Sequence, residues 1–273
     1  MNEVFFDDAF EPRAATRQLP NRTTQVVRIV DGQVLDKAFR VVTLDETNTL
    51  RQPRAGVKSV LGTDADGETL FLIDNVVGGV ERDKAALIGL DLDTGDEQVL
   101  LEDADADLRA YPILDRTTGE PLGTTAYFGA LRRQFVAEEL ADDFEWLEEQ
   151  FRGSAGVVDL GRDDAAWLVI PFDGGPIRYY AYYREPRRLV AVAETQRELS
   201  EAPLAHRTAH VFTARDGLRI PAHLYVAPRF DVDGDGRPDE PLPTLLYVHG
   251  GPHIAAPWDS WFMNRSLQLL AAR

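Results

Sequence analysis

The sequence contains no cysteine. This absence excludes disulfide bonds, thiolate metal ligands and a cysteine nucleophile, although it leaves the cellular compartment open. Lysine is also rare, because Lys37, Lys58 and Lys84 are the three lysines among 29 basic residues. Such a bias fits a salt-adapted organism or a GC-rich genome, and the second explanation is the simpler one.

Long apolar segments and a basic N-terminal stretch are absent as well. No run of about 18 apolar residues could span a membrane, and the first ten residues, MNEVFFDDAF, carry acids where a signal peptide would be basic. A cytoplasmic location is the default expectation, and export stays open if the N-terminus is incomplete. The net charge of −17 argues against nucleic acids and anionic membranes as partners. The oligomeric state is left open.

Short apolar runs of β type fill the sequence from about residue 20 to residue 200. Asp-Gly, Thr-Gly and Gly-Gly pairs between the runs favour hairpins, because these residues tolerate positive φ angles. The clearest runs are residues 67–74, 85–101, 119–128, 165–173 and 178–194. One segment differs: residues 135–151 have helical spacing at Leu140, Phe144 and Leu147, which predicts an inserted helix.

The β-type runs recur with a regular spacing. Similar runs begin at Gly67 and Ala165, 98 positions apart, and others lie at Asp91 and Tyr182, 91 positions apart. Each distance equals two units of about 46–49 residues, which is typical of four-stranded propeller blades. We therefore predict a partial β-propeller of about four blades over residues 1–203. A β-sandwich with irregular spacing is the alternative.

The character of the sequence changes near residue 203. Residues 209–226 predict a hairpin that turns at Arg215–Gly217, and an Asp- and Pro-rich connector follows. The strand predicted at Leu245–Val248 is apolar on both faces, as in a covered α/β sheet. Residues 259–273 then predict a helix with a core-facing stripe formed by Met263, Leu267 and Leu270. The predicted fold class is mainly β, a partial propeller followed by the first strands and helix of an α/β domain.

Three blocks of this second part carry a specific resemblance: "ARDGLRIPAHLYVAP", "LPTLLYVHGGPH" and the Trp-containing helix after them. Together they resemble the start of the catalytic domain in the prolyl oligopeptidase family of serine peptidases, in its acylaminoacyl-peptidase-like or dipeptidyl aminopeptidase-like branch. The upstream β repeats are similar to the propeller of that family. The resemblance implies that residues 204–273 form the N-terminal part of an α/β-hydrolase domain, truncated before the catalytic serine.

The H-G-G-P block would form part of the oxyanion hole. In the family, one backbone N–H of this hole comes from the Gly-Gly turn and another from the residue after the nucleophilic serine. Carried over to this sequence, the resemblance makes the N–H of Gly251 the first donor, with His249 and Gly250 shaping the turn. Glycine suits this position because no Cβ blocks the approach of the substrate carbonyl.

The chain lacks the rest of the catalytic machinery. None of its five serines lies in a G-x-S-x-G elbow, and Ser154 in "FRGSAG" precedes the H-G-G-P block by about 100 residues. We expect the intact protein to cleave peptides by Ser-His-Asp acyl transfer without a cofactor, and this chain to be inactive alone. A non-catalytic β-propeller binding module is the alternative. An HGGG-type esterase is disfavoured because Pro252 follows the glycines and because esterases carry no β-repeat domain.

The connector contains an aspartate-rich segment, "DVDGDGRPDE", at residues 231–240. Asp231, Asp233 and Asp235 fall at positions 1, 3 and 5 of a calcium loop, and Gly236 falls where such a loop turns sharply. Alternating carboxylates converge on one point when the chain curls around an ion.

The remaining ligands of this loop are less typical. The carbonyl of Arg237 and the carboxylate of Asp239 would fill positions 7 and 9, whereas Leu242 replaces the bidentate Glu of an EF-hand. The segment is closer to the short loops of extracellular calcium modules. A calcium site and a solvated acidic linker are both open interpretations.

Overall fold

The structure is a computed structural model. It describes residues 3–20, 24–42, 59–109, 112–151, 153–161, 164–200, 202–248 and 261–273. These residues fall into two compact units: the first extends to Tyr127 and includes Arg132–Glu138, and the second contains Phe128–Leu131 and the residues from Glu139 onward. The domain boundary near residue 203 stays a prediction. No helix in the described ranges is long and apolar enough to cross a membrane.

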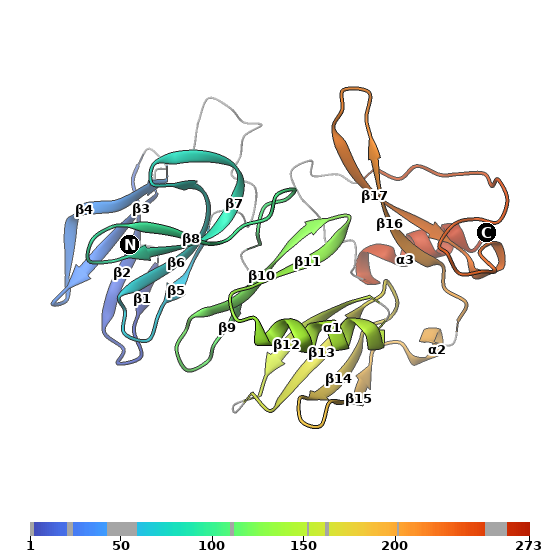
Figure 1. Cartoon of the computed structure of the whole chain (residues 1–273), viewed down its shortest axis with the longest axis horizontal. Coiled ribbons are helices and arrows are strands. Elements are labelled where there is room, and N and C mark those ends of the chain that lie inside the picture. Colours follow the sequence, from blue (N-terminus) through green and yellow to red (C-terminus); the bar gives the residue numbers. More distant parts are fainter. Residues whose placement is uncertain are drawn as a thin grey trace. The chain divides into compact units, whose positions relative to one another are not determined.

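Strands β1 to β11 form three antiparallel sheets (Figure 1). Their bounds are β1 (Glu3–Phe6), β2 (Pro12–Gln18), β3 (Thr24–Val30), β4 (Gln33–Val42), β5 (Ser59–Thr63), β6 (Thr69–Val77), β7 (Val80–Asp91), β8 (Glu97–Leu101), β9 (Ile113–Leu114), β10 (Pro121–Phe128) and β11 (Ala130–Phe135). The sheet orders are β1-β2-β3-β4, β5-β6-β7-β8 and β11-β10-β9. Each sheet thus joins consecutive strands, which is the meander of a propeller blade.

The β5–β8 sheet is buried on both faces. Leu72 and Ile88 point to one face and share a hydrophobic cluster with Val26 of the β1–β4 sheet. Leu87, next to Ile88 in the strand, points to the opposite face and clusters with Ala126 of β10. Because side chains alternate between the faces of a strand, two neighbouring sheets must cover this one. Face-to-face packing of sequential meander sheets agrees with a propeller and not with the sandwich alternative.

Glycine and aspartate form the hairpin turns of these sheets. Gly78 and Gly79 have φ angles of 56° and 78° and connect Val77 to its cross-strand partner Val80. A two-residue turn with two positive φ angles matches the right-handed twist of the flanking strands. Any residue with a Cβ would be strained at both positions.

Two aspartates that begin D-x-x-T-G segments close turns in the same way. The carboxylate of Asp91 accepts the N–H of Thr94 at 2.7 Å, and that of Asp115 accepts the N–H groups of Thr118 and Thr117 at 2.8 and 2.7 Å. These backbone hydrogen bonds hold the pKa values of both carboxyls below their usual range. The ionised form of each carboxylate therefore stabilises its turn.

The second unit contains a further four-stranded meander and the C-terminal elements. Their bounds are α1 (Glu139–Phe151), β12 (Ser154–Leu160), β13 (Ala166–Phe172), β14 (Arg178–Tyr183), β15 (Arg188–Glu194), α2 (Arg197–Ser200), β16 (His206–Thr213), β17 (Arg219–Val226), the 3-10 helix η1 (Pro228–Phe230) and α3 (Trp261–Ala271). The sheet order is β12-β13-β14-β15, and β16 and β17 form a separate hairpin. The predicted fold class, mainly β with a partial propeller, is confirmed.

The repeat spacing seen in the sequence corresponds to equivalent strands. The runs that begin 98 residues apart form β6 and β13, and each is the second strand of its four-stranded sheet. One other sheet, β9–β11, lies between them in the sequence. The distance therefore covers two sheets, as the spacing of two units predicted.

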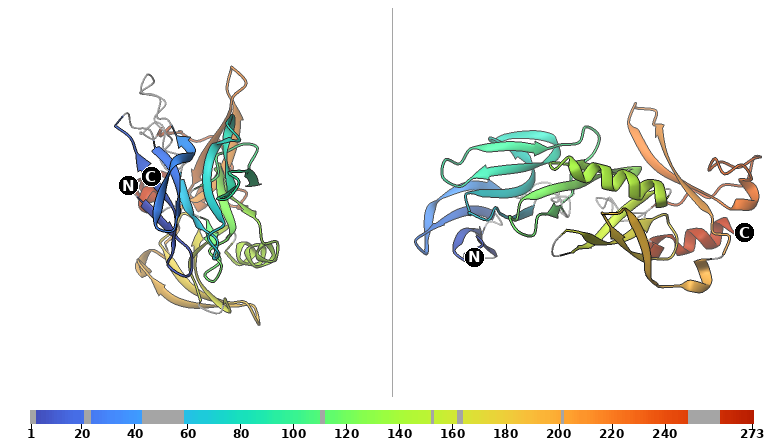
Figure 2. Two further views of the ribbon diagram at one scale, coloured as in Figure 1. Left: turned by 90° about the vertical axis from the view of Figure 1, so that its left-hand side faces the viewer. Right: turned by 60° about the horizontal axis from the view of Figure 1, so that its bottom comes forward.

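Helix α1 lies against the β12–β15 sheet (Figures 1 and 2). Its inward face consists of Leu140, Phe144 and Leu147, which are buried. The ring of Phe144 lies 5.7 Å from that of Trp167 on β13. The helix predicted from the spacing of these residues is confirmed. Its apolar stripe packs against the sheet because a stripe of this width must be covered.

A buried carboxylate joins α1 to the sheet. The side chain of Asp143 is 4% exposed. It accepts the hydroxyl of Tyr182 and the Nε–H of Arg184 at 2.9 Å. Arg184 also pairs with Asp164, which accepts the indole N–H of Trp167. A charge that is taken out of water needs such partners.

This network shifts the pKa values of its members. Burial raises the pKa of Tyr182 well above its ordinary value, and the hydrogen bond to Asp143 raises it further. Burial opposes the charge of Arg184, but the hydrogen bond and the negative charge of Asp143 outweigh it, so that the pKa of Arg184 is raised. Both groups therefore keep their protons, and Asp143 keeps two donors.

The strand predicted at Leu245–Val248 is wrong for this structure. Residues 241–248 form neither strand nor helix, and Leu245 and Leu246 are 65% and 85% exposed. A strand that is apolar on both faces needs neighbouring strands and covering helices. The described part of the chain supplies none of these to the segment.

The C-terminal helix was predicted correctly, but its inward face was not. Leu267 is half-buried, whereas Leu270 is exposed and Gln268 is buried. The side chain of Met263 lies outside the described residues. The helix turns a polar residue inward because the backbone beside it offers hydrogen-bonding groups.

Asp143→Ala should lower the free energy of unfolding by about 3 kcal/mol, because it leaves Arg184 partly buried with one partner fewer. Tyr182→Phe, which removes one donor, should cost about 1.5 kcal/mol. Glu145→Ala, on the exposed face of the same helix, should change the value by less than about 0.5 kcal/mol. Urea unfolding followed by circular dichroism measures all three. Equal effects for Asp143→Ala and Glu145→Ala would contradict the anchoring role.

The exposed segment should make the 273-residue chain self-associate. Leu246→Lys should shift the population toward monomer, since it places a charge in an apolar segment. Val80→Lys, at the exposed valine that begins β7, is the matched control and should have no effect. Sedimentation velocity at micromolar concentrations distinguishes the variants. A parent chain that stays monomeric throughout would refute the prediction.

Candidate functional site

The hairpin that leads toward the predicted catalytic segment has a regular register. β16 and β17 pair from His206↔Val226 to Thr213↔Arg219 without a bulge. Their turn contains Gly217, whose φ angle is 87°. The hairpin predicted from the sequence is confirmed, and its position in the chain is that of the first strands after the propeller repeats.

The predicted oxyanion residues, His249, Gly250 and Gly251, lie outside the described residues. The structure describes the chain up to Val248 and again from Trp261, where α3 begins. The role of Gly251 as a backbone donor therefore stays a prediction from the resemblance.

Ser154 is part of the sheet. It begins β12, and its hydroxyl donates a hydrogen bond to the carbonyl of Leu131 at 3.4 Å. A serine in a strand is not presented on the sharp strand-to-helix turn of a nucleophile elbow. The resemblance of "FRGSAG" to a serine motif is coincidental, as the sequence order indicated.

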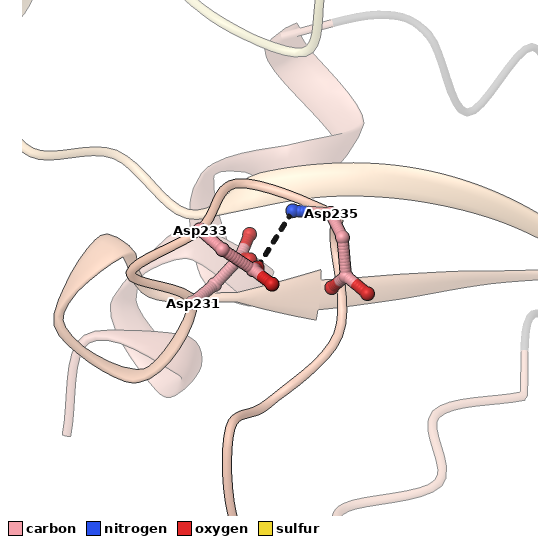
Figure 3. Close-up of side chains that lie close together, drawn as sticks. All are labelled: Asp231, Asp233 and Asp235. Carbon is pink, nitrogen blue, oxygen red and sulfur yellow. Dashed lines mark hydrogen bonds between the residues drawn. The ribbon is translucent and has the colours of Figure 1, made fainter.

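Three of the predicted calcium ligands converge in the connector after η1 (Figure 3). Carboxylate oxygens of Asp231, Asp233 and Asp235 all lie within 4.8 Å of one another. Asp231 is buried, whereas the other two are exposed. The alternating spacing thus brings the side chains to one side of a curled loop.

Asp231 organises this loop. Its two carboxylate oxygens accept the N–H of Gly236 at 3.2 and 3.1 Å. One of them also lies 3.2 Å from Nδ1 of His206, the first residue of β16. The carboxylate therefore closes the loop and joins it to the hairpin.

Gly236 allows the loop to lie against β16. Its φ angle is 80°, and a Cβ on this residue would lie 2.0 Å from Cγ2 of Thr208. The hydroxyl of Thr208 in turn donates to the carbonyl of Gly236 at 3.1 Å. Only glycine meets both the backbone conformation and the close approach.

Of the other two predicted ligands, Asp239 is bound elsewhere, and the role of the Arg237 carbonyl stays a prediction. The carboxylate of Asp239 accepts the N–H of Val232 at 3.1 Å, and Asp239 is not a member of the cluster. The N–H of Arg237 is bound by the carboxylate of Asp235 at 2.8 Å. Carboxylate oxygens at this spacing match the preference of hard cations such as Ca²⁺, and three of the four predicted carboxylate ligands lie together.

Sequence reasoning missed two buried polar residues, Asp143 and Gln268. Asp143 follows Leu140 by three residues and precedes Leu147 by four, so helical spacing alone placed it on the buried face of α1. Gln268 follows the half-buried Leu267 directly on α3. A polar residue within an apolar helical stripe was the signal in both cases.

Comparison with known proteins gives two relatives. No family model matches the chain. It is 28% identical over 216 residues to dipeptidyl aminopeptidase BIII of Pseudoxanthomonas mexicana. The matched region covers 77% of this chain and 31% of that protein. It is also 28% identical over 158 residues to dipeptidyl peptidase family member 6 of Caenorhabditis elegans. That match covers 50% of this chain and 21% of the relative. The chain thus spans less than a third of the length of these relatives.

Two solved structures are similar at a lower level. Prolyl oligopeptidase B of Galerina marginata has 11% identity and a TM-score of 0.44, over 76% of this chain and 27% of the other. TolB of Acinetobacter baumannii has 12% identity and a TM-score of 0.36, over 78% and 49%. TM-scores below 0.5 do not establish a shared fold, so the comparison rests on the two sequence relatives. They confirm the predicted resemblance, because the two relatives are named as a dipeptidyl aminopeptidase and a dipeptidyl peptidase.

Proposed function

We propose that this chain is part of a serine peptidase of the prolyl oligopeptidase family. Residues 1–203 form part of its β-propeller, and residues 204–273 form the first part of its α/β-hydrolase catalytic domain. The 28% identity over 216 residues to a dipeptidyl aminopeptidase carries this proposal. The H-G-G-P block before α3 supports it.

The proposed reaction is peptide-bond hydrolysis by Ser-His-Asp acyl transfer. The N–H of Gly251 stabilises the negative charge that develops on the carbonyl oxygen of the substrate, which is worth about 10²–10³ in rate for one donor. The 273 residues contain no G-x-S-x-G elbow. The nucleophile and its partners would come from residues outside this chain, and the chain alone is inactive.

The proposed substrates are peptides. The propeller would restrict access to short ones, because a ring of blades excludes folded proteins from an enclosed active site. Both relatives are named as dipeptidyl enzymes, which favours release of dipeptides. No cofactor is required for this chemistry.

A non-catalytic β-propeller binding module is the second candidate. The successive antiparallel sheets of the described residues are the observation behind it. The coding sequence beyond Arg273 separates the two proposals. An open frame with G-x-S-x-G within about a hundred residues supports the peptidase, whereas a stop codon directly after Arg273 supports the binding module.

The 273-residue chain should not hydrolyse dipeptidyl chromogenic substrates and should not react with a fluorophosphonate probe, because none of its serines lies in a G-x-S-x-G elbow. A longer product of the same gene with the elbow should do both. Ser154→Ala should leave the longer enzyme active. Labelling of the 273-residue chain, lost in Ser154→Ala, would overturn the assignment of inactivity.

We also propose that the loop at residues 231–239 binds Ca²⁺. The convergence of the Asp231, Asp233 and Asp235 carboxylates supports this proposal, since alternating acids so close together repel one another without a cation. The absence of an acidic residue at position 12 favours weak binding, in the range of about 10⁻⁴–10⁻³ M typical of extracellular modules.

Calcium should therefore stabilise the chain, by about 2.7 kcal/mol at a concentration one hundred times the Kd. Asp233→Asn should weaken the effect at least tenfold, because it removes one exposed ligand and its charge. Glu240→Gln, an exposed neighbour outside the cluster, is the charge-matched control. Calorimetry and thermal shift measure both variants. No heat and no shift at millimolar Ca²⁺ would leave the solvated acidic linker as the correct interpretation.

A further inference from the structure

Strand β15 ends its sheet with an uncovered edge (Figure 1). It pairs with β14 on one side, and no strand in the described ranges pairs with its other side. Its side chains are uncovered as well: Val190 and Val192 are 41% and 59% exposed, and Ala191 and Ala193 are also exposed. An edge strand of this kind offers backbone N–H and C=O groups for pairing with another chain.

The sequence of β15 lacks the residues that usually protect an edge. Residues 188–194 read RLVAVAE, with five apolar residues in a row and neither proline nor lysine. By contrast, β4, which ends the β1–β4 sheet, carries Asp36 and Lys37 within the strand. Charged side chains inside an edge strand discourage pairing with a second strand, because the pairing would cover them. The edge of β15 carries no such charge between its two ends.

The two ends of β15 carry opposite charges, because Arg188 begins the strand and Glu194 ends it. The guanidinium carbon of Arg188 lies 3.7 Å from the ring centre of Tyr183. A guanidinium stacked on a ring still directs its in-plane N–H groups outward, where they can bind a carboxylate. One carboxylate oxygen of Glu194 has no hydrogen-bonding partner among the described residues, and Arg178, opposite it on β14, binds Asp173 instead. The two ends thus offer a donor and an acceptor.

We propose that β15 pairs with β15 of a second copy of this chain and thereby joins the two copies into a dimer. In an antiparallel pair related by a twofold axis, the first residue of one strand lies opposite the last residue of the other. Arg188 of each copy then faces Glu194 of the other, so that two cross-strand ion pairs form. A parallel pair would instead place like charges opposite each other. The order of charges along the strand therefore selects an antiparallel copy of itself.

A β-bulge in β15 is compatible with this pairing. The register shift between the partners of Tyr179 and Tyr180 leaves Val192 as the extra residue of the strand. Both copies contain the bulge, so the two ends of one strand still meet the two ends of the other. Val190 of each copy then lies opposite the bulged part of the second copy. Pairing thus removes exposed valine side chains from water, which favours association.

Charge reversal tests the pairing and its direction in the 273-residue chain. The reference chain and all variants carry Leu246→Lys, to suppress association through the exposed apolar segment. Arg188→Glu should raise the Kd of the dimer about tenfold, because two pairs of like charges then face each other, and Glu194→Arg should do the same. The two reversals combined should return the Kd to within about threefold of the reference, since both ion pairs form again with exchanged signs. Sedimentation velocity measures each Kd.

A matched control separates pairing from net charge. Glu149→Arg, at an exposed position of α1, changes the net charge as much as Glu194→Arg does and should leave the Kd unchanged. Circular dichroism verifies that each variant is folded. A reference chain that stays monomeric at high micromolar concentration would overturn the proposal. A double reversal that associates no better than the single ones would also overturn it, because the two charges would then not face each other.

Hydrogen exchange identifies the paired edge directly. Amides of residues 188–194 that point away from β14 should exchange more slowly as the concentration rises from the low to the high micromolar range, whereas those of β6 and β7 should not change. A longer product of the same gene should behave in the same way. Protection of residues 188–194 that does not depend on concentration would show that the same molecule covers the edge, and would overturn the proposal. Dimerisation without protection of these amides would overturn it as well.

Discussion

A strand that is apolar on both faces must be covered on both faces, and most of this structure follows from that constraint. The β5–β8 sheet meets it, since Leu72 and Leu87 point in opposite directions into two separate clusters. The neighbouring sheets are therefore required on either side, which is the packing of propeller blades. Leu245 and Leu246 carry the same pattern without cover among the described residues, and there the chain forms no strand. The same sequence pattern thus leads to a sheet or to an irregular segment according to what surrounds it.

Buried polar groups define the positions of both long helices. Asp143 binds Tyr182 and Arg184 and so joins α1 to the β12–β15 sheet. Gln268 binds the backbone of Ala205 and so joins α3 to the start of the hairpin. Apolar packing supplies most of the stabilisation of such helices, but it allows several closely related arrangements. Hydrogen bonds with fixed partners select one of them.

Much of the fold could be predicted from the sequence, because hairpin turns and strand runs depend on local chemistry. The spacing from Gly67 to Ala165 identified equivalent strands, and the stripe on α1 identified its buried face. The inward face of α3 could not be predicted, because it depends on the backbone of Ala205, 63 positions away. The convergence of Asp231, Asp233 and Asp235 was predicted from loop spacing alone. The carboxylate of Asp239 is not part of this cluster and accepts the N–H of Val232. Local patterns were therefore reliable where neighbouring sheets cover the strands, but not at Leu245–Val248, and long-range polar pairing could not be predicted.

The order of strands within the sheets has a consequence for how the chain folds. Every strand in the described sheets pairs with its neighbour in the sequence, so each sheet closes short loops only, at a small entropic cost. Sheets built from such local contacts form quickly and do not wait for distant parts of the chain. Assembly can proceed blade by blade during synthesis, and each new blade offers a template face to the next.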